Sequence, residues 1–505
     1  FGGLSLSLAM TRFSDQVHRL YFWDLVGAGA GCLLVIALLG WLGGPLALLA
    51  SSILAAVSAL VFVREARDAV RRQTTALAYA CIGAALLLGA LNPHFRWLEV
   101  HVAKGMNLDV VRPEYNGWNS FSMVTVLPDI GFRGWGLSPS YRGPFPVQKT
   151  LVIDMNAMTP LTRFDGSPAS LGHALYDLSA LVYRVKPDPD RVCVIGAGGG
   201  RDVLAALAAG AERVTGVEIN PLIVNEVMKR RYREFTGNLY HRSDVSIQVE
   251  DGRSFVRRTD ERFDVVLLSM VDTSAATSAG AYALTENGLY TSDAFRDFLG
   301  KLRPGGVLSV STVSLPGLRV GARLAAISRA ALRAQGREVE GAVVVAQTDW
   351  LQPGLGVLHD FLVKPDGFSP SEIETLNRSI KKLQFRAAYL PVGRGDTTSA
   401  ENEWIHQILT ARDDARLAAT VRKWPLDVSA VDDDRPFFFY QNHLRDLGPA
   451  LFGGAAPHLF GNGLFILAKV ALVALAMVVL FLLVPLLLMR RELRVGGGAA
   501  GWDLA

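Results

Sequence analysis

A glycine-rich stretch between two apolar runs constrains the fold of this chain more than any other feature. Residues 191–195 form an apolar run of strand length, and the glycines that follow would end that strand. Helical composition begins at Asp202, so the glycine turn would lie at a helix N-terminus, where free backbone N–H groups can bind a ligand. A second strand is predicted over 214–220, and its Glu218 lies 20 residues after Gly198, the spacing at which a carboxylate can bind both ribose hydroxyls. The sequence therefore predicts a nucleoside-binding site.

The spacing of the glycines indicates which nucleoside is bound. The three alternate glycines allow a sharp turn and the close approach of a ligand. A dinucleotide fingerprint would need a further glycine at position 201, which is Arg201 here, so we favour S-adenosylmethionine or a relative over NAD. The residues predicted to bind this cofactor are Gly196, Gly198, Gly200, Glu218, Asn220, Asp251 and Gly252.

Three further strands follow in the order expected for a doubly wound α/β core. Residues 245–249 are predicted as the third strand, and Asp251 after it is placed to bind an adenine amino group. The fourth strand is 263–269, and a helix over 289–295 leads into a turn and a fifth strand over 302–308. The alternative is an α/β core whose strand-end acids bind nothing.

Four apolar segments predict membrane-spanning helices on both sides of this core. Half of the 505 residues are hydrophobic and only 19% are charged, which is apolar for a soluble enzyme. Residues 23–63 are broken at Gly43-Gly44-Pro45, so we expect two spans joined by a tight hairpin, each about long enough to cross ~30 Å of hydrocarbon. Residues 74–91 and 463–489 predict a third and a fourth span. We therefore expect a multi-pass membrane protein.

The charges beside these segments give a conflicting orientation. Arginines follow the second and fourth spans, and basic flanks mark the cytoplasmic side. If all four segments cross, the large domain would lie on the other side, in the periplasm, where S-adenosylmethionine is not expected. We favour a cytoplasmic domain and leave the periplasm open. The arginines concerned are Arg64, Arg67, Arg71, Arg72, Arg490, Arg491 and Arg494.

Composition argues against disulfides, a metal site and nucleic-acid binding. The three cysteines lie in predicted spans or in the first strand, and the nine histidines have no ligand spacing, so we predict neither disulfide nor metal. A net charge of +4 without a dense basic stripe predicts no nucleic-acid binding. The chain starts with Phe1 in the middle of a pattern, and we expect it to be part of a longer polytopic protein.

Five motifs together resemble the polyamine aminopropyltransferases, the spermidine and spermine synthases, and more closely a bacterial membrane-fused, spermidine synthase-like branch. The resemblance covers roughly residues 116–440. It implies a small β-domain ahead of the core, where strands are expected over 118–126 and 150–155. The motifs are 194–202, 216–220, 250–252, 271–273 with 282–291, and 433–439. The acidic run within the last motif is interpreted as a chain return that docks on the core or the membrane face, without a catalytic role.

The expected organisation follows from the spans, the core and this resemblance. It is a transmembrane region (1–92), a connector and small β-domain (93–160), a Rossmann-like domain (161–445), a transmembrane helix (459–490) and a tail (491–505).

The resemblance also implies the chemistry of the site. The family transfers an aminopropyl group from decarboxylated S-adenosylmethionine to an amine, and the amine must lose a proton before it attacks. The family's pair of aspartates at the end of the fourth strand corresponds here to Ser269 and Asp272, so one carboxylate is missing. A motif of the β-domain survives only in Asp154, and another survives at best as Tyr176-Asp177. The candidate catalytic residues are Asp272, Ser269, Asp154 and Tyr176, with Asp177 or Glu286 assisting.

Three functions remain open from the sequence. The first is an aminopropyl or related alkyl transferase with a small-molecule amine acceptor that Asp272 would anchor. The second is an S-adenosylmethionine-dependent methyltransferase with a lipophilic acceptor, in which Arg201 could bind the donor's carboxylate. The third is a non-catalytic subunit or scaffold of a membrane complex. Membrane lipid, other membrane subunits or a second copy of the chain are the expected partners.

Overall fold

The chain forms two compact units, each built from discontinuous segments. A computed structural model describes residues 2–65, 67–120, 122–271, 285–349, 354, 356–393, 395–446, 463–485 and 487. The first unit comprises Phe1–Phe132, Val147–Arg163 and Pro221–Thr236, and the second unit comprises Arg133–Pro146, Phe164–Asn220 and Gly237–Ala505. Each unit is considered by itself below.

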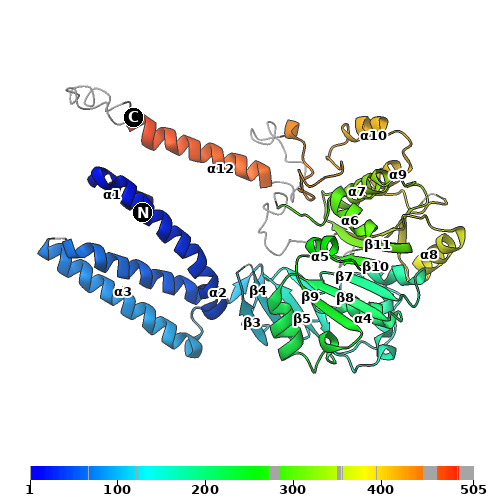
Figure 1. The fold of residues 1–505 in the computed structure, drawn as a ribbon, viewed down its shortest axis with the longest axis horizontal. Helices are drawn as coiled ribbons and strands as arrows, with labels where there is room; N and C mark the ends of the chain where they lie inside the picture. The colour runs from blue at the N-terminus through cyan, green and yellow to red at the C-terminus, as the bar shows by residue number, and fades with distance from the viewer. Residues whose placement is uncertain are drawn as a thin grey trace. The chain divides into compact units, whose positions relative to one another are not determined.

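Long apolar helices dominate the N-terminal part of the first unit (Figure 1). Helix α2 (Val17–Phe62) contains one residue with non-helical dihedrals, Gly43, whose φ of 75° and ψ of 171° reverse the chain direction. Since a positive φ is strained for residues with a Cβ, glycine is required at this reversal. The predicted hairpin at 43–45 is therefore present within α2. Helix α3 (Asp68–Phe95) then packs against α2.

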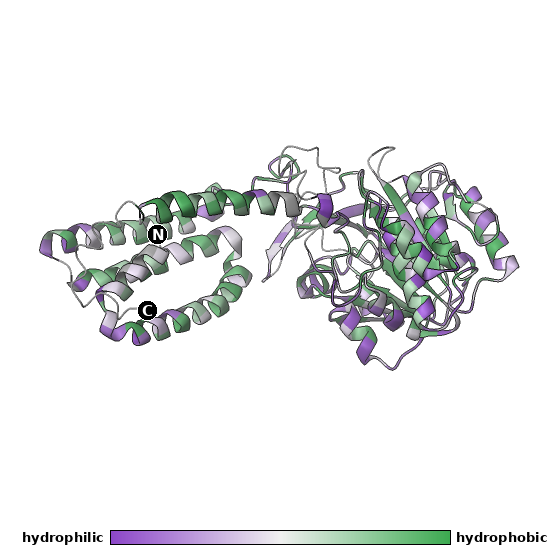
Figure 2. Cartoon of the chain, turned by 90° about the horizontal axis from the view of Figure 1, so that it is seen from above, coloured by the Kyte–Doolittle hydropathy of each residue, from purple (hydrophilic) through white to green (hydrophobic). Residues whose placement is uncertain are grey.

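Two helices among the described residues are long and apolar enough to cross a membrane, by length and composition alone. They are Ser14–Phe62 and Asp68–Phe95, and few of their side chains are buried within the protein. Figure 2 shows hydrophobic residues along much of their length. A shorter apolar helix, Leu467–Phe481, lies near the C-terminus. Because a buried core helix or a signal sequence can have the same length and composition, membrane insertion stays a prediction.

A small antiparallel sheet completes the first unit. Its strand order is β3-β4-β5-β6. The sequence pattern predicted one strand where the structure has β3 and β4. The expected strand over 118–126 contains a turn in which the Asn119 side chain accepts a hydrogen bond from the Ser122 backbone at 2.8 Å. Strand β6 lies at the sheet edge and contains Pro160, a residue typical of edge strands. The elements of this unit that follow α3 are β1 (Val102–Ala103), β2 (Met106–Asn107), β3 (Tyr115–Trp118), β4 (Met123–Leu127), β5 (Gln148–Ile153), β6 (Ala157–Thr162) and the π-helix η5 (Leu222–Arg231).

An eight-stranded mixed sheet forms the centre of the second unit. Its strand order is β14-β12-β13-β11-β10-β7-β8-β9, in which β11, β10, β7, β8 and β9 are parallel and the rest antiparallel. The predicted third and fourth strands have the predicted bounds. The strands are β7 (Arg191–Ile195), β8 (Arg213–Glu218), β9 (Val245–Val249), β10 (Phe263–Ser269), β11 (Leu302–Ser314), β12 (Val343–Asp349), β13 (Val357–Val363) and β14 (Arg386–Tyr389). This is a Rossmann-type α/β fold, as expected.

Helices cover both faces of this sheet (Figure 1). One face buries Val266 and Val310 with Phe295 of α6 in the main hydrophobic core. The other face packs against the 3-10 helix η4, which contacts β10, β11, β12 and β13. Residues 168–184 form two 3-10 helices separated by the extended residue Asp177. The helices are η3 (Pro168–Tyr176), η4 (Leu178–Arg184), α4 (Arg201–Ala208), α5 (Gly252–Arg258), α6 (Ser292–Gly300), α7 (Val320–Ala334), α8 (Pro370–Lys382), α9 (Ala400–Thr410), α10 (Asp414–Val421) and α12 (Gly463–Val478).

Candidate active site

The glycine loop between β7 and α4 has the strained backbone that its sequence predicts. Gly196, Gly198 and Gly200 have φ values of +77°, +50° and +85°, which residues with a Cβ rarely adopt. A Cβ on Gly196 would lie 2.5 Å from the Val271 side chain. A residue larger than glycine would therefore not fit at position 196. Helix α4 starts directly after the loop, at Arg201.

Glu218 at the end of β8 fixes this loop. Its Oε2 accepts a hydrogen bond from the Gly198 backbone and its Oε1 accepts one from the Asn220 backbone, both at 2.9 Å. Burial raises the pKa of Glu218, while the backbone donors act in the opposite direction. Each carboxylate oxygen can accept a further hydrogen bond. Glu218 could therefore accept from ribose hydroxyls while it keeps the loop in place.

Tyr240 supports the same loop and was not singled out in the sequence. Its side chain is buried, and its hydroxyl donates to the Gly198 carbonyl at 2.7 Å. Gly198 is thus bound on its N–H by Glu218 and on its carbonyl by Tyr240. A single aromatic residue ahead of β9 gives no sequence signal for this contact.

Asp251 and Gly252 lie where the third strand meets α5. The Asp251 side chain caps α5 by accepting from the Ser254 backbone at 2.8 Å. A Cβ on Gly252 would lie 2.4 Å from Ile195, the last residue of β7, so close packing requires glycine. The seven predicted cofactor residues therefore lie after the carboxyl ends of β7, β8 and β9, three neighbouring strands of one sheet.

Arg201 is the centre of a buried ionic cluster beside the glycine loop. Its guanidinium donates to both carboxylate oxygens of Asp202 at 3.2 Å and lies 3.5 Å from Asp177 Oδ2. It also donates to the Ser269 hydroxyl at the end of β10. Burial lowers the pKa of Arg201, but the two aspartates outweigh burial and raise it overall, so the guanidinium stays charged. Ser179 links the acids by donating to Asp202 at 3.0 Å and to Asp177 at 3.3 Å.

A polar row crosses the sheet beneath this cluster. Ser269 of β10 is in register with Ser311 of β11, and Ser311 is in register with Asp360 of β13. Ser311 and Ser309 donate to Asp360 Oδ1 at 2.9 and 3.0 Å. Asp360 Oδ2 is buried and has no hydrogen-bond partner in the described part of the chain. Burial raises the pKa of Asp360 to about 7, and the charges of Asp177 and Asp202 act in the same direction.

The predicted catalytic residues are only partly brought together. Ser269 lies in the ionic cluster. Tyr176 immediately precedes Asp177, and the Tyr176 ring packs edge-on against the Tyr141 ring, with centroids 5.0 Å apart. Asp154 belongs to the first unit, where its Oδ1 accepts from the Met123 backbone at 2.7 Å beside the β5–β6 turn. Asp272 lies outside the described residues. Glu286 is exposed.

Two features of the cluster were not predicted: the contact of Asp202 with Arg201, and the burial of the Asp202 and Asp360 side chains. In the ranges that the structure describes, no group of three or more His, Cys, Asp and Glu residues could hold a metal ion.

Comparison with known proteins agrees with this geometry. Residues 176–315 match the family model described as "Spermine/spermidine synthase domain". A polyamine aminopropyltransferase of Sulfolobus acidocaldarius is 26% identical over 171 residues, which are 34% of this chain and 52% of that protein. Polyamine aminopropyltransferase 2 of Hyperthermus butylicus is 30% identical over 127 residues, 25% of this chain and 39% of that protein. The spermidine synthase structure from Thermotoga maritima has a TM-score of 0.35 at 17% identity, covering 54% of this chain and 88% of that one.

The chain spans about half or less of the length of these curated relatives. The matched segment starts at Tyr176 and includes the glycine loop, Glu218, Asp251 and Ser269. Residues 176–315, which hold the candidate site, are therefore similar to the spermine/spermidine synthase domain.

Proposed function

We propose that this protein is a membrane-bound, spermidine synthase-like transferase that uses decarboxylated S-adenosylmethionine and alkylates an amine acceptor with its aminopropyl group. The glycine loop would contact the donor's nucleoside, Glu218 its ribose and Asp251 its adenine. Two features of the site suit such a ligand: the loop lies at the N-terminus of α4, and the Glu218 oxygens can each accept a further hydrogen bond. The donor supplies a methylene carbon beside a sulfonium, which an unprotonated amine can attack.

The charge of the ionic cluster carries this proposal. Two acids, Asp177 and Asp202, contact one guanidinium, that of Arg201, which leaves one carboxylate in excess, and the buried carboxyl of Asp360 interacts with the same guanidinium at longer range. An excess of carboxylates favours a cationic tail, such as the aminopropyl ammonium, over the carboxylate of intact S-adenosylmethionine. Arg201 could have bound that carboxylate, but it already contacts two aspartates and Ser269.

The acceptor must lose a proton before it attacks, and we assign this task to Asp272 by the resemblance. Ser269 is a poor substitute, because a serine hydroxyl does not ionise near neutral pH and this one accepts from the Arg201 guanidinium. That contact is also the observation that favours the second candidate, a non-catalytic subunit or scaffold. In that case the chain would keep the nucleoside-binding half of the site and would lack the half that binds and deprotonates the acceptor.

We further infer that the apolar helices of the first unit anchor the protein in a bacterial inner membrane. Their side chains are largely exposed, so lipid or another membrane subunit would have to cover them. We place the nucleoside-binding domain in the cytoplasm, where its donor is made.

Calorimetric titration of the detergent-solubilised protein tests this function. Methylthioadenosine, decarboxylated S-adenosylmethionine and S-adenosylmethionine would be titrated in parallel. We expect the decarboxylated donor to bind about tenfold more tightly than the intact one, which is about 1.4 kcal/mol. Preference for the intact donor would support a methyltransferase, and binding of none of the three would support a scaffold.

A matched pair of variants locates the binding. Glu218→Gln replaces a carboxylate that accepts two backbone hydrogen bonds, and we expect methylthioadenosine affinity to fall about tenfold to a hundredfold. Glu261→Gln is the control, because Glu261 pairs with Arg191 at the start of β7, the opposite end of that strand from the glycine loop. Equal effects of both substitutions would contradict the assignment of Glu218.

A further inference from the structure

The segment that follows α10 is built into the core of the second unit. This segment, residues 424–443, is called the C-terminal strap here. The buried side chain of Arg323 in α7 donates to strap carbonyls, including those of Phe437 at 3.1 Å and Phe438 at 2.9 Å. The Phe438 ring is fully buried and stacks on Tyr290 with centroids 4.6 Å apart. The strap is therefore a fixed part of the domain.

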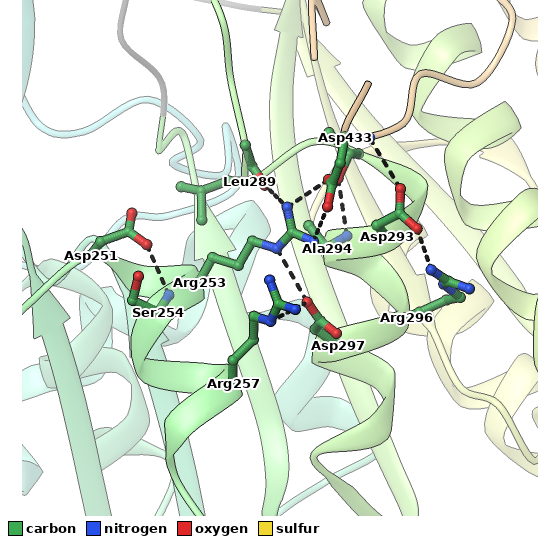
Figure 3. A network of polar contacts seen from close by, with 12 residues as sticks. Asp251, Arg253, Ser254, Arg257, Leu289, Asp293, Ala294, Arg296, Asp297 and Asp433 are labelled. Carbon is green, nitrogen blue, oxygen red and sulfur yellow. Dashed lines mark hydrogen bonds and ion pairs between the residues drawn. The ribbon is translucent and has the colours of Figure 1, made fainter. Parts of the chain in front are cut away.

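Asp433 connects the strap to two helices that carry or flank the candidate site. Both of its carboxylate oxygens accept from the Arg253 guanidinium at 2.6 Å, in a bidentate pair (Figure 3). The Thr291 hydroxyl donates to the same carboxylate at 2.8 Å, and the Asp433 backbone donates to Asp293 at 3.1 Å. These donors hold the pKa of Asp433 below its ordinary value, with Arg253 as the main cause. Asp433, which was interpreted from the sequence as part of a chain return docked on the core or the membrane face, therefore has four specific contacts.

Arg253 transmits this fixation to the nucleoside end of the site. It is the second residue of α5 and directly follows Asp251 and Gly252. Its guanidinium also donates to Asp297 of α6 at 3.2 Å, so the first turn of α5 is fastened to α6 and to the strap at once (Figure 3). The two members of the Arg253–Asp433 pair are 180 residues apart in sequence.

We propose that Arg253 and Asp433 are positioning residues, which orient the first turn of α5 so that Asp251 and Gly252 meet the adenine end of the donor. This inference rests on the proposed function for its ligand. Neither side chain needs to touch the nucleoside, since the pair acts through the backbone that bears Asp251. The strap is thus part of the cofactor site, although it lies far from the glycine loop in sequence.

Asp433→Asn tests the proposal, since it keeps the shape of the side chain and removes its charge. Asp414→Asn is the matched control: Asp414 also pairs with a buried arginine, Arg329 of α7, but at the start of α10. Hydrogen exchange of the peptide covering 252–258 is measured first, without ligand. We expect exchange of this peptide to be about tenfold faster in Asp433→Asn and unchanged in Asp414→Asn. Unchanged exchange in Asp433→Asn would overturn the proposal whatever the protein binds.

Calorimetry with methylthioadenosine then tests the consequence for the site. We expect affinity to fall about two- to thirtyfold in Asp433→Asn, to recover in Asp433→Glu, and to stay unchanged in Asp414→Asn. Equal losses in both asparagine variants would reduce the pair to a general structural contact and overturn the positioning role. Failure of the unsubstituted protein to bind methylthioadenosine would overturn the proposed function and the ligand part of this inference. Hydrogen exchange of the peptide covering 252–258 would still decide whether the Arg253–Asp433 pair fixes α5.

Discussion

Replacing Asp360 with asparagine should change how the stability of this protein depends on pH. Asp360 lies fully buried on β13, where Ser309 and Ser311 donate to one of its oxygens. Its other oxygen has no partner among the residues described. Burial raises the pKa of this carboxyl from 3.8 to about 7. The folded protein therefore binds a proton at Asp360 that the unfolded chain would release.

The sign and size of the effect follow from this raised pKa. Stability from Asp360 is fully present below the unfolded pKa of 3.8 and is lost as the pH rises through the folded value of about 7. One proton corresponds to about 1.36 kcal/mol per pH unit, so the unsubstituted protein should lose about 2–3 kcal/mol between pH 5 and pH 7. An asparagine does not ionise and escapes this loss. Its amide donors lack an acceptor, which costs about 1–3 kcal/mol at every pH.

Thermal unfolding of both proteins in the same detergent, followed by tryptophan fluorescence at pH 5, 6, 7 and 8, measures the difference. The melting temperature of Asp360→Asn relative to the unsubstituted protein should rise by about 2–4 °C from pH 5 to pH 7 and then stay nearly level. Asp260→Asn, at an exposed position, should show no such trend. A difference between Asp360→Asn and the unsubstituted protein that is the same at all four pH values would refute the reasoning, because Asp360 would then not titrate in this range.

Two further substitutions test the ionic cluster and the helical hairpin. Arg201→Met should lower stability by about 3–5 kcal/mol at pH 8, since it leaves Asp177 and Asp202 buried without their counter-ion, and thermal unfolding at pH 5 should recover part of this loss. A loss independent of pH would point to packing instead. Gly44→Ala should cost about 1–3 kcal/mol, because its Cβ would lie 2.9 Å from the Trp118 ring. Gly40→Ala, whose Cβ would meet nothing within 4 Å, is the control and should be neutral or stabilising in the same melting assay.

The central strands of the parallel half could be predicted because they are apolar runs that are buried on both faces. The bounds of β10 were predicted correctly for this reason, and those of β9, a more exposed edge strand, were also correct. The sharp turn predicted at the glycines is present, with a positive φ at Gly196. The small sheet was harder to predict. Its expected first strand ran through the Asn119 turn, and β6 contains a proline that disguised it.

The ionic cluster and the individual contacts of the strap could not be predicted, because they join segments far apart in sequence, although docking of this chain return on the core or the membrane face was expected. Arg201 and Ser269 are 68 residues apart, and only the packing of β7 beside β10 brings them together. Asp433 lies in an acidic run, a pattern that is usually a solvated turn. Its bidentate contact with Arg253 depends on a docking position of the strap that local periodicity does not encode.

The helical hairpin of the first unit bears on the proposed orientation in a membrane. The chain reverses at Gly43, next to Trp118 of the small sheet, and α3 leads back toward the same strands (Figure 1). The arginines between α2 and α3 therefore lie at the opposite end of these segments from the sheet. If the segments cross a bilayer, as we propose, the positive-inside rule places this turn in the cytoplasm and the sheet outside, whereas a cytoplasmic donor requires the reverse. If the protein binds its donor in the cytoplasm, the turn between α2 and α3 must lie outside, against the positive-inside rule. If this turn is cytoplasmic, as the rule predicts, the non-catalytic scaffold is the better candidate function.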